Sequence, residues 1–342
     1  MQAVVMRDRK LLVDEVPNPE PGPGQVLVKS LACGICGSDL HALKFAPEFV
    51  AASEASTGIF NMDLSRDVVM GHEFCVEVLA YGPDTEARIP VGERAAAMPG
   101  LLHEGHNYAV GYCNDFPGGY AEQLLVTANA LVATPDSLPS EHAAMTEPMA
   151  VGIHAVRKGN IQDGEAVVVY GCGPVGLATI GALKMDGVET IIAGDFSPKR
   201  RELAAAMGAD VVVDPRETPL AAAYREARGD APAVLIECVG VPGMLDLAIL
   251  EATVGSRIVV AGLCMQEDTI RPAIAINKEI NLQFVLGWTA REFIESAEAL
   301  SSGKLDVSPL VTGRIGLNEV AEAFETLGNP EAHAKIVVLP NG

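Results

Sequence analysis

The chain has 342 residues, a length typical of two domains, and 49% of them are hydrophobic, as in globular proteins. Its 45 Asp and Glu residues outnumber 24 Lys and Arg residues, and the resulting net charge of −21 argues against nucleic-acid binding. No apolar run reaches the ~18 residues that span a bilayer, and the first residues lack the apolar core of a signal peptide. We therefore expect a cytoplasmic protein with neither nucleic-acid nor membrane partners.

The chain contains seven cysteines, an odd number spread over its whole length. This pattern argues against a disulfide framework and fits a reducing compartment. A functional cysteine is then expected to be a metal ligand or a nucleophile.

The first part of the chain, up to residue 134, has short apolar runs separated by Gly and Pro turns, which predicts an irregular, strand-rich domain. From about residue 159 the pattern changes to strand, turn and helix, which predicts an α/β domain with a doubly wound parallel sheet. Its strands are expected at 166–170, 190–194, 210–213, 233–237 and 257–262. Helical stretches at 291–302 and 317–327 and a strand-like AKIVVLP follow, and their pattern does not decide which domain they join.

A glycine-rich turn directly follows the expected strand at 166–170 and opens an apolar helix. In this setting, Gly–x–Gly–x–x–Gly allows a tight turn, close approach of a pyrophosphate, and tight helix–strand packing. The helix N-terminus would attract the phosphates. The candidate cofactor-binding residues are Gly171, Gly173, Pro174, Val175 and Gly176. Methyltransferases also use such turns, so the motif alone does not define a dehydrogenase.

Asp195 ends the next expected strand, nineteen residues after Gly176. A carboxylate there accepts hydrogen bonds from the ribose hydroxyls of NAD and repels the 2′-phosphate of NADP. We therefore expect NAD as the preferred cofactor. Lys199 and Arg200 follow closely, so NADP is not excluded.

Three clusters of candidate metal ligands lie in the first half of the chain: CGICGSDLH at 33–41, GHE at 71–73 and TEP at 146–148. Cys, His and Glu side chains suit Zn²⁺ when they converge. The CxxC pair alone could be a redox motif, but no thioredoxin-like context surrounds it.

The segments CGICGSDLH, GHE, PGGYAE, EPMAVGIHAV and GCGPVG occur in the order and at the spacings of the zinc-dependent medium-chain alcohol dehydrogenases. The chain resembles this family over its whole length, most closely the polyol, butanediol and threonine dehydrogenase branch. The resemblance implies a chaperonin-10 (GroES)-like catalytic domain at 1–150 and 290–342, around a Rossmann NAD-binding domain at 151–289. It also implies a homodimer or homotetramer.

The resemblance further implies one catalytic zinc ion bound by Cys36 and His72. The third protein ligand would be Glu147 or Glu73, which the sequence does not rank. Asp39 matches a carboxylate that orients the ligand histidine. The zinc would lower the pKa of the substrate alcohol, and hydride would pass to the nicotinamide.

The same resemblance makes Ser38 and His41 a catalytic proton relay from the alcohol to solvent. Imidazole suits this role because it titrates near neutrality. Taken alone, either residue would be read as an ordinary cap or surface residue.

The chain also departs from the family pattern. Many relatives bind a structural zinc through four close cysteines, but the matching stretch has only Cys113, so we expect no structural zinc. His103 and His106 in that stretch are read as part of a solvated loop. Trp288 falls near a position that contacts substrate hydroxyls in relatives, although it could equally pack the domain junction. Because the segment at 43–69 is largely apolar, we expect a moderately apolar secondary alcohol or its ketone as substrate, in preference to sorbitol.

Other interpretations remain open. A polyol, butanediol or threonine dehydrogenase belongs to the same branch. A zinc-free quinone or enoyl reductase shares the architecture without needing the ligand set. A non-catalytic nucleotide-binding sensor or a methyltransferase would need only the glycine-rich turn.

Overall fold

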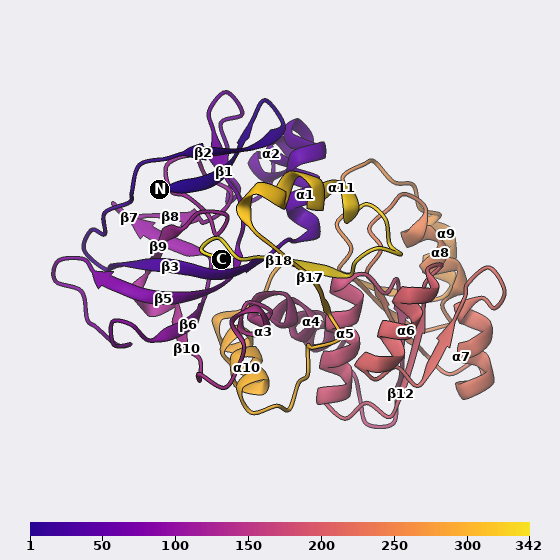
Figure 1. The fold of residues 1–342 in the computed structure, drawn as a ribbon. Coiled ribbons are helices and arrows are strands. Elements are labelled where there is room, and N and C mark those ends of the chain that lie inside the picture. The colour runs from indigo at the N-terminus through magenta and orange to yellow at the C-terminus, as the bar shows by residue number, and fades with distance from the viewer.

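The computed structural model describes residues 1–342, which form two halves that lie side by side. In Figure 1 the strand-rich half contains the indigo and magenta segments, and the other half contains a sheet flanked by the pink and orange helices. Both chain termini lie in the strand-rich half, so the chain leaves this half and returns to it.

The strand-rich half is built on a seven-stranded sheet. Six strands follow the order β10-β6-β5-β3-β18-β17, and β9 pairs with β3. The strands are β3 (Gln25–Gly34), β5 (Glu73–Tyr81), β6 (Arg94–Ala97), β9 (Gln123–Thr127), β10 (Leu131–Ala133), β17 (Val311–Ile315) and β18 (Lys335–Val338). The antiparallel pairing of β3 with β5 places Gly34 opposite Glu73. The CGIC and GHE segments therefore meet at one end of this strand pair.

Smaller elements complete this half. A three-stranded sheet contains β1 (Gln2–Arg7), β2 (Lys10–Glu15) and β4 (Val68–Val69), and a separate hairpin contains β7 (Gly100–His103) and β8 (His106–Ala109). The helices are α1 (Gly37–Lys44), α2 (Ala46–Glu54) and α3 (Ser140–Ala143), with a 3₁₀ turn at Ala128–Ala130. The next helix, α4 (Thr146–Gly159), leads into the second half and packs on its helices and strands.

The C-terminal segment crosses back to this half. β18 pairs with the end of β3, with Val337 opposite Gly34, and β17 lies parallel to β18 on its other side. A 3₁₀ turn (Leu317–Glu319) and α11 (Val320–Thr326) connect the two strands, while α10 (Ala290–Ser301) packs on α4.

The second half is a six-stranded, entirely parallel sheet in the order β13-β12-β11-β14-β15-β16. Its strands are β11 (Ala166–Tyr170), β12 (Thr190–Gly194), β13 (Val211–Val213), β14 (Val234–Glu237), β15 (Arg257–Val260) and β16 (Asn281–Phe284). Its helices are α5 (Pro174–Met185), α6 (Pro198–Met207), α7 (Leu220–Arg228), α8 (Met244–Glu251) and α9 (Pro272–Asn277). This order is that of a doubly wound Rossmann sheet, which confirms the predicted fold class.

The continuous apolar run of β11 has the expected physical cause. Val167 and Val169 pack into the core under α4, α5 and α6, whereas Val168 and Tyr170 pack on the opposite face against α7 and α8. A central parallel strand covered on both faces needs apolar side chains at every position. The edge strand β16 was not predicted because its four residues are exposed and show no apolar run.

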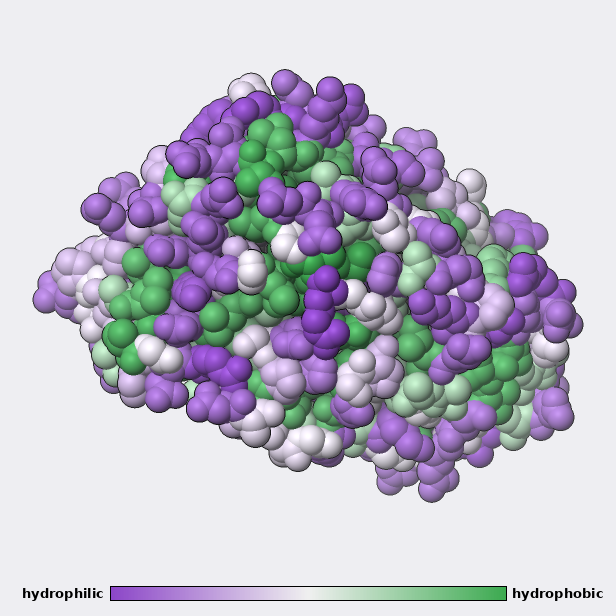
Figure 2. Space-filling model, in the orientation of Figure 1, coloured by the Kyte–Doolittle hydropathy of each residue, from purple (hydrophilic) through white to green (hydrophobic).

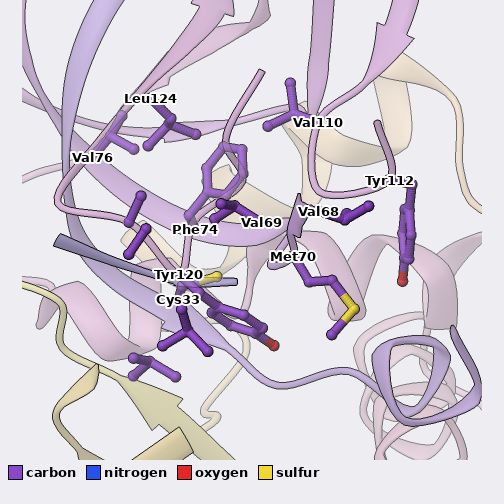
Figure 3. Close-up of a cluster of buried hydrophobic side chains, with 14 of the residues drawn as sticks. Cys33, Val68, Val69, Met70, Phe74, Val76, Val110, Tyr112, Tyr120 and Leu124 are labelled. Carbon is purple, nitrogen blue, oxygen red and sulfur yellow. The ribbon is translucent and has the colours of Figure 1, made fainter. Parts of the chain in front are cut away.

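The core of the strand-rich half surrounds the end of β3 (Figure 3). Cys33, Met70, Phe74 and Tyr120 are buried there and their side chains lie close together. Figure 2 shows that hydrophilic residues cover much of the face in view, while hydrophobic residues gather near its middle, at the junction of the halves. None of the helices combines the length and apolar character needed to cross a membrane.

Candidate metal centre and cofactor site

Cys36 lies at the turn between β3 and α1. Its backbone N–H donates to Asp39 Oδ2 at 3.1 Å, so the carboxylate of the third helical residue fixes the entry into α1. Ser38 and His41 follow on the same helix, one turn apart, which places them on one face. Cys33 is fully buried, as a structural residue would be.

His72 and Glu73 lie at the start of β5, directly after Gly71. Gly71 has a φ of +96°, and a Cβ there would lie 2.7 Å from the ring of Tyr120 and 2.9 Å from Cys33 Sγ. Only glycine fits this turn, and the turn directs His72 toward Cys36.

Cys36, His72 and Glu73 place one thiol, one imidazole and one carboxylate oxygen within 4.8 Å of one another. His72 and Glu73 are buried and Cys36 is partly exposed. Thiolate, imidazole and carboxylate are the ligand types that bind zinc, so the donor chemistry fits this metal. Of the four predicted ligands, Cys36, His72 and Glu73 therefore lie close enough together to bind one metal ion.

Glu147, the fourth predicted ligand, is buried in the first turn of α4. Trp288 Nε1 donates to Glu147 Oε1 at 2.7 Å, while no hydrogen bond reaches Oε2. Burial raises the pKa of Glu147, although the nearby His72 charge opposes this effect. A cation at the centre would favour the ionised form.

The Glu73 carboxylate has a different environment, because both of its oxygens accept hydrogen bonds from Lys335 Nζ at 2.7 Å. Both side chains are completely buried. Burial lowers the pKa of Lys335, but the Glu73 charge outweighs it, and the pKa is raised overall. Sequence reasoning missed Lys335; its signal was a lysine within an otherwise apolar strand.

Asp39 is fully buried at the back of the centre, where Oδ1 lies 3.3 Å from His72 Nδ1. Tyr120 Oη donates to Oδ2 at 2.7 Å. Burial opposes ionisation of Asp39, but the His72 charge and these hydrogen bonds outweigh it and lower its pKa. In the same way, burial is outweighed by the Asp39 and Cys36 charges, so the pKa of His72 lies well above its usual value.

The structure does not join Ser38 directly to His41 by a hydrogen bond. Ser38 Oγ instead lies 2.8 Å from Tyr112 Oη, a residue that the sequence did not indicate. His41 Nδ1 is buried without a partner, and burial together with the Lys44 charge lowers the pKa of His41.

The glycine-rich turn lies between β11 and α5, where the motif requires it. Gly171 has a φ of +85°, and a Cβ on Gly176 would lie 1.9 Å from the Gly171 carbonyl oxygen. Gly173 caps α5, and Pro174 and Val175 form its first turn. The turn thus presents the helix N-terminus at the carboxyl edge of the sheet.

Asp195 lies directly after β12 beside this turn. Its Oδ2 accepts a hydrogen bond from the Cys172 N–H at 2.8 Å, and its Oδ1 accepts one from the Ser197 N–H at 2.9 Å. Arg200 Nη1 lies 4.0 Å from Oδ2. The carboxylate is thereby held at the rim of the phosphate cradle.

His103 and His106 face each other across the β7–β8 hairpin, so the segment is a strand pair with a tight turn rather than an irregular loop. His106 and the two turn residues are exposed to solvent, as predicted for this segment. His103 packs against Phe116 at a ring distance of 5.1 Å, and Tyr108 lies 5.0 Å from Phe116. Cys113 is buried and its thiol lies against the Phe116 carbonyl. Aromatic packing therefore holds together the segment that carries four cysteines in many relatives.

A parallel sheet with a dinucleotide turn, next to a buried Cys–His–Glu cluster, defines a class: nucleotide-dependent oxidoreductases with a metal centre. Two family descriptions match the chain. "Alcohol dehydrogenase GroES-like domain" matches residues 22–136, and "Zinc-binding dehydrogenase" matches residues 174–302.

Known proteins resemble the chain along its full length. The (R,R)-butanediol dehydrogenase of Bacillus subtilis is 32% identical, with 100% of both chains covered. The sorbitol dehydrogenase of the same organism is 30% identical, covering 100% of this chain and 98% of the relative.

Solved structures bound to either nicotinamide cofactor have the same fold. A zinc-binding dehydrogenase from Sinorhizobium meliloti bound to NADP superposes with a TM-score of 0.83 at 27% identity, with 99% of each chain covered. An Escherichia coli alcohol dehydrogenase bound to NADH has a TM-score of 0.84 at 26% identity and the same coverage. The chain belongs to the zinc-dependent medium-chain alcohol dehydrogenase family, and it is a nicotinamide-dependent dehydrogenase of CH–OH groups.

Proposed function

We propose that this enzyme uses NAD and one catalytic zinc ion to oxidise a moderately apolar secondary alcohol to its ketone, reversibly. The observation that carries this proposal is the convergence of Cys36, His72 and Glu73 near a cluster of aromatic side chains. We further propose that residues 1–150 and 290–342 act as the catalytic domain and residues 151–289 as the cofactor domain.

Zinc bound at this centre would supply Lewis acidity toward the alcohol oxygen. Cys36 and His72 are its first two proposed ligands. For the third we propose Glu147, although Glu73 is the closer by the distance criterion. Both Glu73 oxygens are already bound by the Lys335 ammonium group, whereas Glu147 has a free oxygen and no cationic partner. A buried carboxylate with an unpaired oxygen gains most from a bound cation.

The remaining residues position these groups. Asp39 supports the imidazole of His72 and limits its rotation. Ser38 is proposed to receive the alcohol proton, and His41, one turn further along α1, to carry it toward solvent. Trp288 contacts the site through Glu147, and we propose that its ring borders the substrate.

The substrate class follows from the side chains of α2 and its neighbours. Phe49, Phe60 and Tyr112 stack on one another at ring distances of 4.9–5.4 Å, and Tyr112 lies 5.1 Å from His72. This wall offers apolar contacts near the metal centre rather than partners for several hydroxyl groups.

The butanediol dehydrogenase relatives support a second candidate substrate, a short vicinal diol, because each hydroxyl-bearing carbon of 2,3-butanediol is a secondary alcohol that carries a methyl group. The test compares kcat/KM for cyclohexanol, 2-alkanols, 2,3-butanediol, sorbitol and threonine, with metal analysis of the same sample. We expect the highest value for a monoalcohol or the butanediol. A higher value for sorbitol or threonine contradicts the proposal.

The NAD preference is supported by the position of Asp195, whose carboxylate would meet a 2′-phosphate. We expect Asp195→Ala to reduce the NAD over NADP ratio of kcat/KM by at least tenfold, with Arg200 then free to bind the phosphate. An Asp210→Ala variant, which alters a carboxylate away from the turn that bonds the Ile191 N–H, is the matched control. An unchanged ratio in Asp195→Ala removes the proposed role.

We also propose that the enzyme is a dimer that pairs through β16. This strand has a neighbour on one side only, and all four of its residues are exposed. Leu282 and Phe284 expose 37% and 61% of their surface, and Ile276 and Leu286 nearby expose 72% and 64%. An unpaired edge with apolar neighbours is suited to antiparallel pairing with the same strand of a second copy.

A further inference from the structure

Three consecutive cations, Lys199, Arg200 and Arg201, lie in the first turn of α6, beside Asp195 at the proposed cofactor site. Arg200 Nη1 lies 4.0 Å from Asp195 Oδ2. Arg201 Nη1 donates to the backbone oxygen of Asp195 at 2.8 Å and to Asp214 Oδ2 at 3.0 Å. Both arginines are therefore held on the second half of the molecule. The Lys199 ammonium group points elsewhere.

Lys199 Nζ donates a hydrogen bond to the backbone oxygen of Ala332 at 2.6 Å. Ala332 lies 133 residues further along the chain, in the segment that enters β18 of the strand-rich half. The bond therefore joins the two halves. A cation in the first turn of a helix is opposed by the helix dipole, so Lys199 does not stabilise α6 by its charge. Its bond to the other half offsets this cost.

The Ala332 carbonyl is a fixed acceptor, because the chain is anchored on both sides of it. The Ala332 N–H donates to the Asn329 oxygen at 3.1 Å, which closes a turn. The N–H groups of Ala334 and Lys335 donate to Thr312 Oγ1 of β17 at 3.0 and 3.3 Å. The acceptor thus moves with the strand-rich sheet, and the Lys199 bond must break whenever the halves separate at this point.

We propose that Lys199 is a positioning residue that fastens the two halves together beside Asp195, so that the nicotinamide cofactor enters and leaves only when its bond to Ala332 opens. Dinucleotides bind at the carboxyl edge of a parallel sheet, and this bond lies at that edge, directly after β12. Because Lys199 is engaged by Ala332, it does not bind a 2′-phosphate. The proposal rests on the cofactor site proposed above and deepens it, because it assigns what limits cofactor exchange.

The test measures the association and dissociation rate constants of NADH by stopped-flow fluorescence on the zinc-loaded enzyme. In Lys199→Met much of the apolar stem remains but the bond is lost. We expect both rate constants to rise about tenfold, as for the loss of one hydrogen bond to a charged group. The Kd of NADH should stay within twofold, because the bond is made with and without cofactor. A residue that contacts the cofactor would instead change mainly dissociation and the Kd.

Two further variants isolate the cause. Lys199→Arg keeps a donor, so both rate constants should stay within threefold of the wild type; a tenfold rise would mean that the hydrogen bond is not responsible. Lys184→Met is the matched control, because this lysine of α5 has its carboxylate neighbour, Asp210, at 4.0 Å in its own half. Its rate constants should equal those of the wild type.

Unchanged rate constants in Lys199→Met would overturn the proposal, as would an equal rise in Lys184→Met. A rise in dissociation alone, or a selective loss of NADPH affinity, would also overturn it, since either result would place Lys199 in contact with the cofactor. Failure of the proposed cofactor site is a different result, namely an unchanged NAD over NADP ratio in Asp195→Ala.

Discussion

Substitution of Cys36 tests the metal centre separately from the cofactor site. This residue belongs to the metal cluster, while the glycine-rich turn and Asp195 lie in the other half of the molecule. We expect Cys36→Ser to lose most of its zinc and at least 10³-fold in kcat, while NAD binding changes less than threefold. Metal analysis and cofactor titration measure the two effects, and normal alcohol oxidation by this variant would contradict the zinc mechanism.

Glu147 and Glu73 are the two candidates for the third zinc ligand, and the zinc affinities of their variants distinguish them. If Glu147 is the third ligand, Glu147→Gln should lower the zinc affinity by 10- to 100-fold or more, and Glu73→Gln should lower it less. Competition with a chelator measures both affinities. A larger loss in Glu73→Gln would reverse the ligand assignment.

Lys335 stabilises the fold by neutralising Glu73. Removing one partner of a buried ion pair leaves an uncompensated charge, which costs about 3–5 kcal/mol. We expect Lys335→Met to lower the free energy of unfolding in urea by about that amount in metal-free enzyme. The double variant Glu73→Gln/Lys335→Met should recover most of the loss, and failure to recover it would mean that packing rather than charge is responsible.

At the scale of elements, α10 is connected to α4 by a buried pair. Glu292 accepts hydrogen bonds from the Thr289 N–H and hydroxyl, which cap α10, and its Oε2 lies 2.9 Å from His154 Nδ1 of α4. The Glu292–His154 pair lies close to Trp288 in the chain, so it helps to hold the loop from which Trp288 donates a hydrogen bond to Glu147.

The stability that the Glu292–His154 pair contributes should depend on pH through the pKa of Glu292. Burial raises that pKa, but the hydrogen bonds from Thr289 and the contact with His154 outweigh it and lower the pKa below its usual 4.5. A lowered pKa stabilises the fold above the unfolded-state value, and this stabilisation is lost as the pH falls through the folded-state value. We expect Glu292→Gln to be less stable than the wild type at pH 7, with the difference shrinking below about pH 4.5. Urea midpoints at several pH values measure this, and a constant difference would contradict it.

At the scale of the whole molecule, the exposed edge at β16 predicts the assembly. We expect Leu282→Lys/Phe284→Lys to be monomeric in light scattering under conditions where the wild type is dimeric or larger, because the charges oppose each other across a two-fold axis. Val91→Lys, which alters an equally exposed apolar residue in the other half, should keep the wild-type mass. A dimeric double variant would place the interface elsewhere.

Several features could be predicted from the sequence because their physical causes are local. The parallel strands follow from apolar runs, the dinucleotide turn from glycines that need positive φ or close approach, and α6 from Pro198 in its first turn and Gly208 after its end. The candidate ligands could likewise be named from residue types and motif spacing, since Cys36, His72 and Glu73 do converge.

The partners of those residues depend on contacts between distant parts of the chain, and only the tertiary structure decided them. Lys335 reaches Glu73 across 262 residues because β18 pairs with β3, and Trp288 reaches Glu147 across 141 residues through the packing of α10 on α4. Tyr112 meets Ser38 only because the loop after β8 folds over α1. The sequence by itself determined which side chains could do chemistry. The fold determined which partners the carboxylates of Asp39, Glu73 and Glu147 find, because most buried polar groups are hydrogen-bonded and their partners come from distant parts of the chain.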